Sequence, residues 1–462
     1  MKRLVRACIA FFILLGIVLC CGCGKAEEKD ESLWVLADVG ESRLIDKVAQ
    51  SFQQAHPDVP LLIEYVPRDA QERELYLEQV RTKIMAGQGP DVFWLNKYSE
   101  VFSDVEQSMH NGLFLDISAY YDQDTALEKD GFAQSIMEAG VVDGKRYILP
   151  LYCNFPVLYV DTQQLASAGI SLDTLGRGLS GLFEVTQKLG KTAVTADITQ
   201  TEWYYLQNFF SEMIDYETQE VTWSKRQLTE FLTQYRELLT LAQGEYISWL
   251  PISIGNYISN NEYLGQEGTC VYWGTLEQLV NIVRVAKTTG TELAVIPMTA
   301  YDGSVCAQVS NLGAIGANTD KPELAYEFLR AFLLQENQWE NGLGDINGYL
   351  TTQNWPVLVK DSWVHIDEDI WQGQMGGAGS RWIEGSLTRR AAVAATTVTA
   401  EDYAILNTEI SKVYLPLDCA DDFMMTIRQQ LNPYLNPDAA SVDVEALADQ
   451  LIQQLQWLVA EG

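Results

Sequence analysis

Hydrophobic residues along the chain alternate between two spacings, and this alternation predicts strands separated by helices. A continuous apolar run at 33–37 has the form of a buried strand, and apolar residues at 44, 45, 48, 49 and 52 then lie on one face of a helix. A second run at 61–66, a helix carrying Leu77, Val80 and Ile84, and a third run at 91–95 continue the pattern. The sequence therefore predicts an α/β protein with mostly parallel sheets.

Two helices are expected in the second half of the chain. Asp320 is the expected N-cap of one helix, because Glu323 follows it at the position that completes a capping box. Ser441 is the expected cap of the last helix, in which leucines recur every three or four residues from 447 to 458.

The beginning of the chain has the plan of an export signal. Residues 1–22 open with three basic side chains, continue with an apolar run at 8–19 and end in small residues. This run is too short to span a membrane comfortably, so an uncleaved anchor helix is the less favoured alternative. Polar residues dominate 25–30, and we expect 1–22 to be a signal peptide and 23–31 a linker.

Composition and charge exclude several classes of function. The chain has 462 residues, 47% of them hydrophobic, which is enough for a large core, and its net charge is −32. Such a charge repels phosphate backbones, so we expect no nucleic-acid partner. The histidines, His56, His110 and His365, are far apart in the sequence and give little basis for a multi-histidine metal site.

Short motifs for cofactors are present only in incomplete form. The glycines of a G-x-G-x-x-G pattern at 176–181 do not follow a clear strand, and we interpret them as a flexible loop before a helix at Phe183. A segment that partly matches a P-loop has Val185 in place of the first glycine. Another segment that partly matches a calcium-binding loop has Leu127 where the loop needs glycine. The sequence therefore predicts no cofactor, no metal ion and no identifiable catalytic residue, and the protein is not expected to be an enzyme.

Several segments, taken in order, resemble the extracellular solute-binding proteins of ABC importers, specifically family 1, the maltose-binding-protein-like group. The most specific segment is Gly-x-Gly-Pro-Asp at 87–91. The other matching segments are 52–57, 112–117, 143–150, 158–161, 268–274 and 294–298. Each segment is weak alone, but their order makes coincidence improbable.

This resemblance implies a two-lobed periplasmic-binding-protein-like fold of type II with hinge crossings. We expect the crossings near 150–155, 307–312 and 347–351. Lobe 1 would then comprise 32–150 and 312–347, and lobe 2 would comprise 156–306 and 352–462. The ligand would bind in the cleft between the lobes, and hinge closure would exclude water.

The cysteine-containing segment near the start of the chain resembles a second known sequence pattern. The segment 19–24 resembles a bacterial lipoprotein box, in which a small residue precedes the cysteine that is lipid-modified. Cys23, preceded by Gly22, is the expected site of lipid attachment, and Cys21 is the alternative. The sequence does not decide whether the remaining cysteines form disulfides, although buried thiols are the default expectation for Cys153, Cys270, Cys306 and Cys419.

Candidate ligand residues follow from position and from the resemblance. A sugar needs flat apolar surfaces together with hydrogen-bonding groups. Trp94 and Asn96 rank first because they lie at the carboxyl end of a predicted strand, where open α/β sheets bind ligands; burial of Trp94 under the next helix is the alternative. Trp273 ranks second, because it matches a ligand-stacking aromatic residue of the family.

The other candidates have competing structural roles. Tyr152 and Asn154 follow Pro150 at the expected first crossing and face either the cleft or the hinge. Asp38 and Glu41 can accept hydrogen bonds from sugar hydroxyls, although helix capping is the commoner role. The weaker candidates, in loop-like surroundings, are Tyr349 and Trp382.

These observations lead to one expected function and two alternatives. We expect a monomeric, lipid-anchored receptor on the extracytoplasmic face of the cell membrane, which captures a small polar solute such as an oligosaccharide and delivers it to the permease subunits of an ABC importer. A surface polysaccharide hydrolase and an adhesion lipoprotein are the alternatives.

Overall fold

The structure is a computed structural model, and the description below concerns the residues whose placement it defines. These residues are 32–38, 42–96, 100–102, 105–190, 194–196, 213–215, 218, 220–242, 270–276, 279–300, 303–334, 355–356, 396, 402, 404–405, 408–415, 430–431, 433–434 and 442–461.

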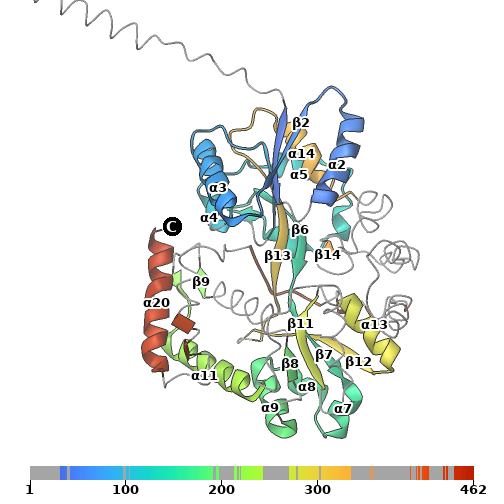
Figure 1. Ribbon diagram of the computed structural model, residues 1–462, viewed down its shortest axis with the longest axis vertical. Helices are drawn as coiled ribbons and strands as arrows, with labels where there is room; N and C mark the ends of the chain where they lie inside the picture. Colours follow the sequence, from blue (N-terminus) through green and yellow to red (C-terminus); the bar gives the residue numbers. More distant parts are fainter. Residues whose placement is uncertain are drawn as a thin grey trace, which may run out of the picture.

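The described strands form two principal sheets (Figure 1). The first sheet has the order β14-β6-β13-β3-β1-β2, and β15 also pairs with β13. Its strands are β1 (Leu33–Asp38), β2 (Leu61–Val66), β3 (Val92–Asn96), β6 (Ile148–Asn154), β13 (Cys306–Ile315), β14 (Trp355–Pro356) and β15 (Lys412–Tyr414). The second sheet has the order β12-β7-β11-β8, with β7 (Pro156–Asp161), β8 (Val194–Ala196), β11 (Val271–Thr275) and β12 (Leu293–Pro297).

Helices cover both faces of the first sheet. On one face, α2 (Ser42–Ala55) and α14 (Pro322–Arg330) pack against the side of β1 and β3 that carries Ala37 and Trp94. On the other face, α3 (Ala70–Met85) and α4 (Val105–His110) cover Leu36 and Phe93. The alternation of neighbouring residues between the two faces explains why these strands read as continuous apolar runs.

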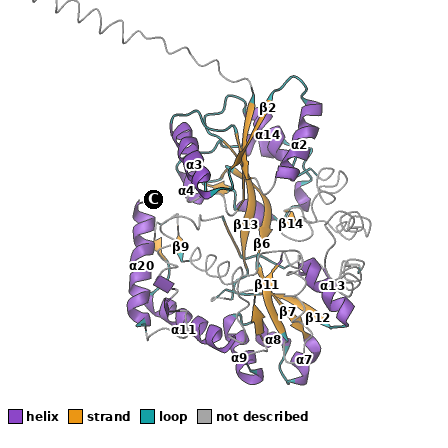
Figure 2. Ribbon diagram, in the orientation of Figure 1, coloured by secondary structure: helices purple, strands orange, loops and turns teal. Residues whose placement is uncertain are grey.

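The second sheet packs against helices from distant parts of the chain. Its core joins Val160 and Val271 of the sheet to Leu232, Leu451 and Leu455 of the helices. Figure 2 shows these helices around the sheet, and α20 is in contact with α11. They are α7 (Thr162–Ser167), α8 (Leu172–Leu175), α9 (Leu179–Leu189), α11 (Lys225–Ala242), α13 (Leu279–Thr289) and α20 (Val444–Glu461).

Short elements complete the described part of the chain. They are α5 (Ser118–Gln123), the 3-10 turn η2 (Lys129–Gly131), α6 (Gln134–Glu138), and two small antiparallel pairs, β4 (Val141–Val142) with β5 (Lys145–Arg146) and β9 (Ile214–Asp215) with β10 (Glu220–Val221).

The chain passes between the two sheets at two described places. Phe155 alone separates β6 of the first sheet from β7 of the second, and residues 298–305 lead from β12 back to β13. The expected crossing at 347–351 lies outside the described residues. β14 and β15 pair with strands of the first sheet, which differs from the expected placement of 352–462 in lobe 2. The lobe boundaries stay a prediction.

The structure corrects the expectation that the sheets are mostly parallel. Parallel pairs join β1 to β2 and β3, β8 to β11, and β13 to β15. Antiparallel pairs join β13 to β3 and β6, β14 to β6, and β7 to β11 and β12. The sheets are mixed because the strands that carry the chain between them run against their neighbours.

Two predicted helix caps are also wrong. Lys321 is the N-cap of α14, without a side-chain cap hydrogen bond, and Pro322 begins the helix, so Asp320 lies one residue too early. At α20, the Asp443 carboxylate accepts hydrogen bonds from the backbone N–H groups of Glu445 at 3.0 Å and Ala446 at 3.2 Å. Asp443 is therefore the N-cap of α20, the role that was expected of Ser441. Ser441 lies outside the described residues.

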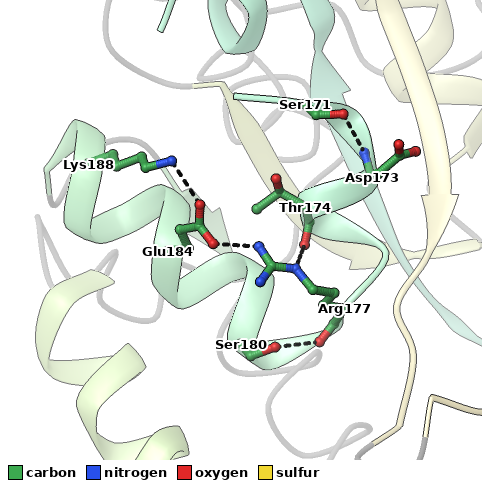
Figure 3. A network of polar contacts seen from close by, with 7 residues as sticks. All are labelled: Ser171, Asp173, Thr174, Arg177, Ser180, Glu184 and Lys188. Carbon is green, nitrogen blue, oxygen red and sulfur yellow. Dashed lines mark hydrogen bonds and ion pairs between the residues drawn. The ribbon is translucent and has the colours of Figure 1, made fainter. Parts of the chain in front are cut away.

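The glycine-rich segment at 176–181 is a tight corner between α8 and α9, not the expected flexible loop. Figure 3 shows the polar contacts that hold it: the Arg177 guanidinium donates to the carbonyl of Thr174 and to the Glu184 carboxylate, and Lys188 donates to Glu184 at 2.8 Å. The hydrogen bonds from Lys188 and Arg177 lower the pKa of Glu184 to about 2. The side chains thus fix the angle between the two helices.

Gly181 is required by the close approach of these helices. A Cβ atom on Gly181 would lie 2.0 Å from the carbonyl oxygen of Thr174, which is rigid backbone. Gly176, in the same corner, has no contact shorter than 3.4 Å at the corresponding position and has a right-handed backbone conformation.

We predict that Gly181→Ala destabilises the protein by roughly 1–3 kcal/mol, because the added methyl group must push α8 and α9 apart. The matched variant Gly176→Ala should change the free energy of unfolding much less. Urea denaturation followed by circular dichroism measures both values. Equal stability of the two variants would show that the corner is not tightly packed.

Candidate functional site

Polar side chains from three neighbouring strands form one row across the first sheet. Asn311 of β13 is paired with Asn96 of β3 on one side and with Tyr152 of β6 on the other. Paired residues of adjacent strands project to the same face, so two amides and a phenol lie side by side. Asn96 is the last residue of β3 and is partly exposed, whereas Asn311 and Tyr152 are buried. The polar row (Asn96, Asn311 and Tyr152) therefore reaches the surface at the carboxyl end of β3.

A second polar pair lies next to this row. Gln308 of β13 is paired with Asn154 of β6, and both side chains are 0% exposed. Neither the amide nitrogen nor the amide oxygen of Gln308 has a hydrogen-bond partner anywhere in the described structure. An unpaired buried amide costs about 1–3 kcal/mol of folding free energy, so this position is kept polar at the expense of stability.

The pairing between β6 and β13 is irregular between these two polar pairs. The register shifts between Val309 and Asn311, which leaves Ser310 of β13 as an extra residue, and again between Asn311 and Leu312, where the extra residue is Leu151 of β6. Ser310 is 1% exposed and its hydroxyl has no partner within the described residues. Irregularities of this kind locally bend a strand and redirect its side chains. Here they place the polar side chains next to the point where the chain leaves the first sheet.

Trp94 lies in the core in this structure. It is paired with Gly313, is 0% exposed, and its ring lies 5.8 Å from that of Phe332. Gly313 lets α14 approach the sheet, because a Cβ atom there would come within 2.6 Å of the Leu329 side chain. Trp94 is thus buried, but beside α14 and Phe332 and not under the next helix along the chain, α4, which covers the other face of the sheet; stacking against a ligand stays a prediction.

Trp273 is also a packed residue, in the second sheet. It is 3% exposed and is paired with Leu158, on the face of β11 that points into the core under α9 and α11. The preceding residue, Tyr272, faces the other side, where its ring lies 6.0 Å from that of Tyr159. A role for Trp273 in ligand stacking likewise stays a prediction.

The remaining candidates are not brought together with the polar row. Asp38 is buried, and its pairing with Val66 places it on the opposite face of the sheet, with Leu36. The other candidates lie outside the described residues; they are Glu41, Tyr349, Trp382 and the lipid-attachment residue Cys23.

Asp91 explains the Gly-Pro-Asp segment and was missed as an individual residue. Its carboxylate accepts hydrogen bonds from the backbone N–H of Trp34 at 2.9 Å and from the hydroxyl of Thr319 at 2.6 Å, and the Lys321 ammonium group lies 3.6 Å away. These contacts tie β1, β3 and the segment after β13 together, so Asp91 helps to position β3 and β13, two of the three strands from which the polar row is built.

The described cysteines are buried, and the described acidic residues form no cluster that could hold a metal ion. Cys153 is a buried free thiol, and burial raises its pKa to about 12. Cys270 and Cys306 are buried and reduced, whereas Cys419 lies outside the described residues. Within the described residues there is no group of three or more His, Cys, Asp or Glu side chains placed to hold a metal ion, and no helix is both long and apolar enough to cross a membrane.

We predict that Trp94→Ala lowers the free energy of unfolding by roughly 3–5 kcal/mol, because it opens a cavity against Phe332. Trp94→Phe should lose much less, since it keeps an aromatic ring and removes an indole N–H that has no hydrogen-bond partner among the described residues. Chemical denaturation measures both values. A variant Trp94→Ala that keeps its stability and loses ligand affinity would instead identify Trp94 as a ligand residue.

Comparisons with known proteins agree with this fold. Solved structures that resemble the chain include an ABC substrate-binding protein from Listeria monocytogenes in complex with cycloalternan, with 14% identity and a TM-score of 0.53 over 93% of this chain and 99% of that chain. A family 1 extracellular solute-binding protein from Alicyclobacillus acidocaldarius has 16% identity and a TM-score of 0.56, covering 93% and 98%. A periplasmic oligogalacturonide-binding protein from Yersinia enterocolitica has 16% identity and a TM-score of 0.56, covering 93% and 99%.

These identities are low, so the structural likeness establishes the fold, which is the expected type II periplasmic-binding-protein-like fold. No curated protein matches the chain. The family model for bacterial extracellular solute-binding proteins matches residues 37–339, well over half of the 462 residues. The chain therefore belongs to the family of bacterial extracellular solute-binding proteins.

Proposed function

We propose that this protein is a lipid-anchored receptor on the extracytoplasmic face of the cell membrane, which captures a small carbohydrate and delivers it unchanged to the permease subunits of an ABC importer. The observation that carries this proposal is the polar row on three strands of a solute-binding fold. Amide and phenol groups both donate and accept hydrogen bonds, as sugar hydroxyls do. The row is uncharged, which suits a neutral solute.

The structural relatives support a carbohydrate ligand. Three of the similar solved structures are of proteins that bind cycloalternan, oligogalacturonide and raffinose. Two strands of the polar row, β6 and β13, lead along the chain to the second sheet, so a ligand held at the exposed end of the row would lie near the connection between the sheets. Closure around such a ligand would bury it and create the shape that an importer recognises.

The anchor and the absence of catalysis are further parts of the proposal. The signal-like segment 1–22 and the lipid-attachment candidate Cys23 support tethering at the membrane surface. The family is a family of binding proteins, and the role proposed here requires that the ligand leave chemically intact.

A panel of neutral and acidic oligosaccharides, read by thermal denaturation, tests the function. We expect at least one neutral oligosaccharide to raise the melting temperature in proportion to the logarithm of its concentration, because it binds only the folded protein. Mass spectrometry of the recovered ligand should show it unchanged. Hydrolysis of the ligand by the purified protein would contradict the proposal and favour the surface hydrolase.

Asn96→Ala tests the polar row directly. Loss of one amide that hydrogen-bonds the ligand should weaken binding by about tenfold in titration calorimetry, while the melting temperature without ligand changes little because Asn96 is partly exposed. Asn318→Ala is the matched control, since Asn318 is an exposed asparagine beyond the other end of β13. If both variants bind as tightly as the unaltered protein, Asn96 does not contact the ligand.

A further inference from the structure

A pocket on α20 shares no lining residue with the polar row. Its volume is about 320 Å³, and five side chains line it, Gln430, Gln450, Gln453, Gln454 and Trp457. We call it the glutamine–tryptophan pocket. It is an open hollow of the surface and not an enclosed cavity, so a ligand held there stays partly exposed to solvent.

The helix α20 is held in place by contacts on one face, and the pocket lies on another face of the same helix. Leu447, Leu451 and Leu455 are buried in the core of the second sheet, and the Lys225 ammonium group of α11 forms an ion pair with Asp449 at 2.6 Å. The lining residues of α20 follow one another at spacings of three, one and three residues and so share one face of the helix. The pocket is therefore built on a rigid element.

The lining carries hydrogen-bonding groups without charge. The carbonyl oxygens of Gln430 and Gln454 are buried and have no hydrogen-bond partner in the described part of the chain. A buried acceptor without a donor is unfavourable, so a ligand that supplies hydroxyl groups would relieve this cost. The last side-chain torsion angle of glutamine has a broad, shallow energy profile, so each amide can rotate and turn its oxygen toward a bound ligand.

Trp457 supplies a flat surface at the same place. Its side chain is 57% exposed, which is unusual for tryptophan, a residue that is highly buried on average. An indole ring packs well against the C–H face of a sugar ring, while neighbouring amides bind the hydroxyls around the rim. A charged ligand would find no opposite charge among these five side chains, and an extended peptide needs a longer groove.

We propose that the glutamine–tryptophan pocket binds a single unit of a neutral carbohydrate, as a second site separate from the polar row. None of its residues belongs to β3, β6 or β13, so the two sites are distinct parts of the chain. The pocket does not depend on the proposed transport function.

The test follows the Trp457 signal directly in the full-length protein. Tryptophan is replaced by 5-fluorotryptophan, and the ¹⁹F resonance of Trp457 is identified by its loss in Trp457→Phe. Maltotriose, raffinose and pentaglycine are then titrated separately. We expect at least one trisaccharide to shift this resonance saturably, and pentaglycine to leave it in place.

Variants separate this site from its surroundings. Gln454→Ala should weaken the response by about tenfold, whereas Gln456→Ala, an exposed neighbour that does not line the pocket, should not change it. Asn96→Ala should also leave the response intact, which distinguishes this proposal from the proposed function. A resonance unmoved by both trisaccharides, an equal response in Gln454→Ala, or a response to pentaglycine alone would overturn the proposal.

Discussion

The hydrogen-bonded pair of β6 and β13 is the constraint on which the rest of this molecule depends. Each strand belongs to the first sheet and is joined along the chain to a strand of the second, β6 through Phe155 alone. A single hydrophobic cluster, with members from Trp94 to Tyr159 and Tyr272, continues across the same connection. The positions of the two sheets, and of the polar groups between them, are therefore set by one ladder of backbone hydrogen bonds and one continuous core.

The early elements could be predicted from the sequence because their hydrophobic spacing is regular. The strand, helix, strand, helix and strand from 33 to 96 were expected within a few residues of the observed bounds. Strand direction was not predictable in the same way, since an apolar run is the same whichever way its neighbour runs. The expectation of mostly parallel sheets failed at β13, which returns from the second sheet against β3 and β6.

The candidate site could be predicted only in part. Asn96 and Tyr152 were chosen for their places after a strand and a proline, and the structure does bring them together. The residue that lies between them, Asn311, was missed, because a polar residue inside an apolar run gives no sign of its partners. Which residues lie beside Asn311 depends on the register between the strands, and that register is set by tertiary packing and not by the local sequence. Trp94 shows the opposite case, in which a residue at the expected place is covered by Phe332, which follows α14 and lies more than two hundred residues away in the sequence.

The extra residue at Ser310 has a mechanical consequence for the molecule. A regular ladder resists bending along its whole length, whereas a ladder with two register shifts within a few residues has fewer backbone hydrogen bonds to distort at that point. If one sheet rotates relative to the other, the strain would therefore concentrate at these register shifts, where the ladder bends most easily. Faster amide hydrogen exchange at 309–311 than in the rest of β13 would be the signature of such a compliant joint.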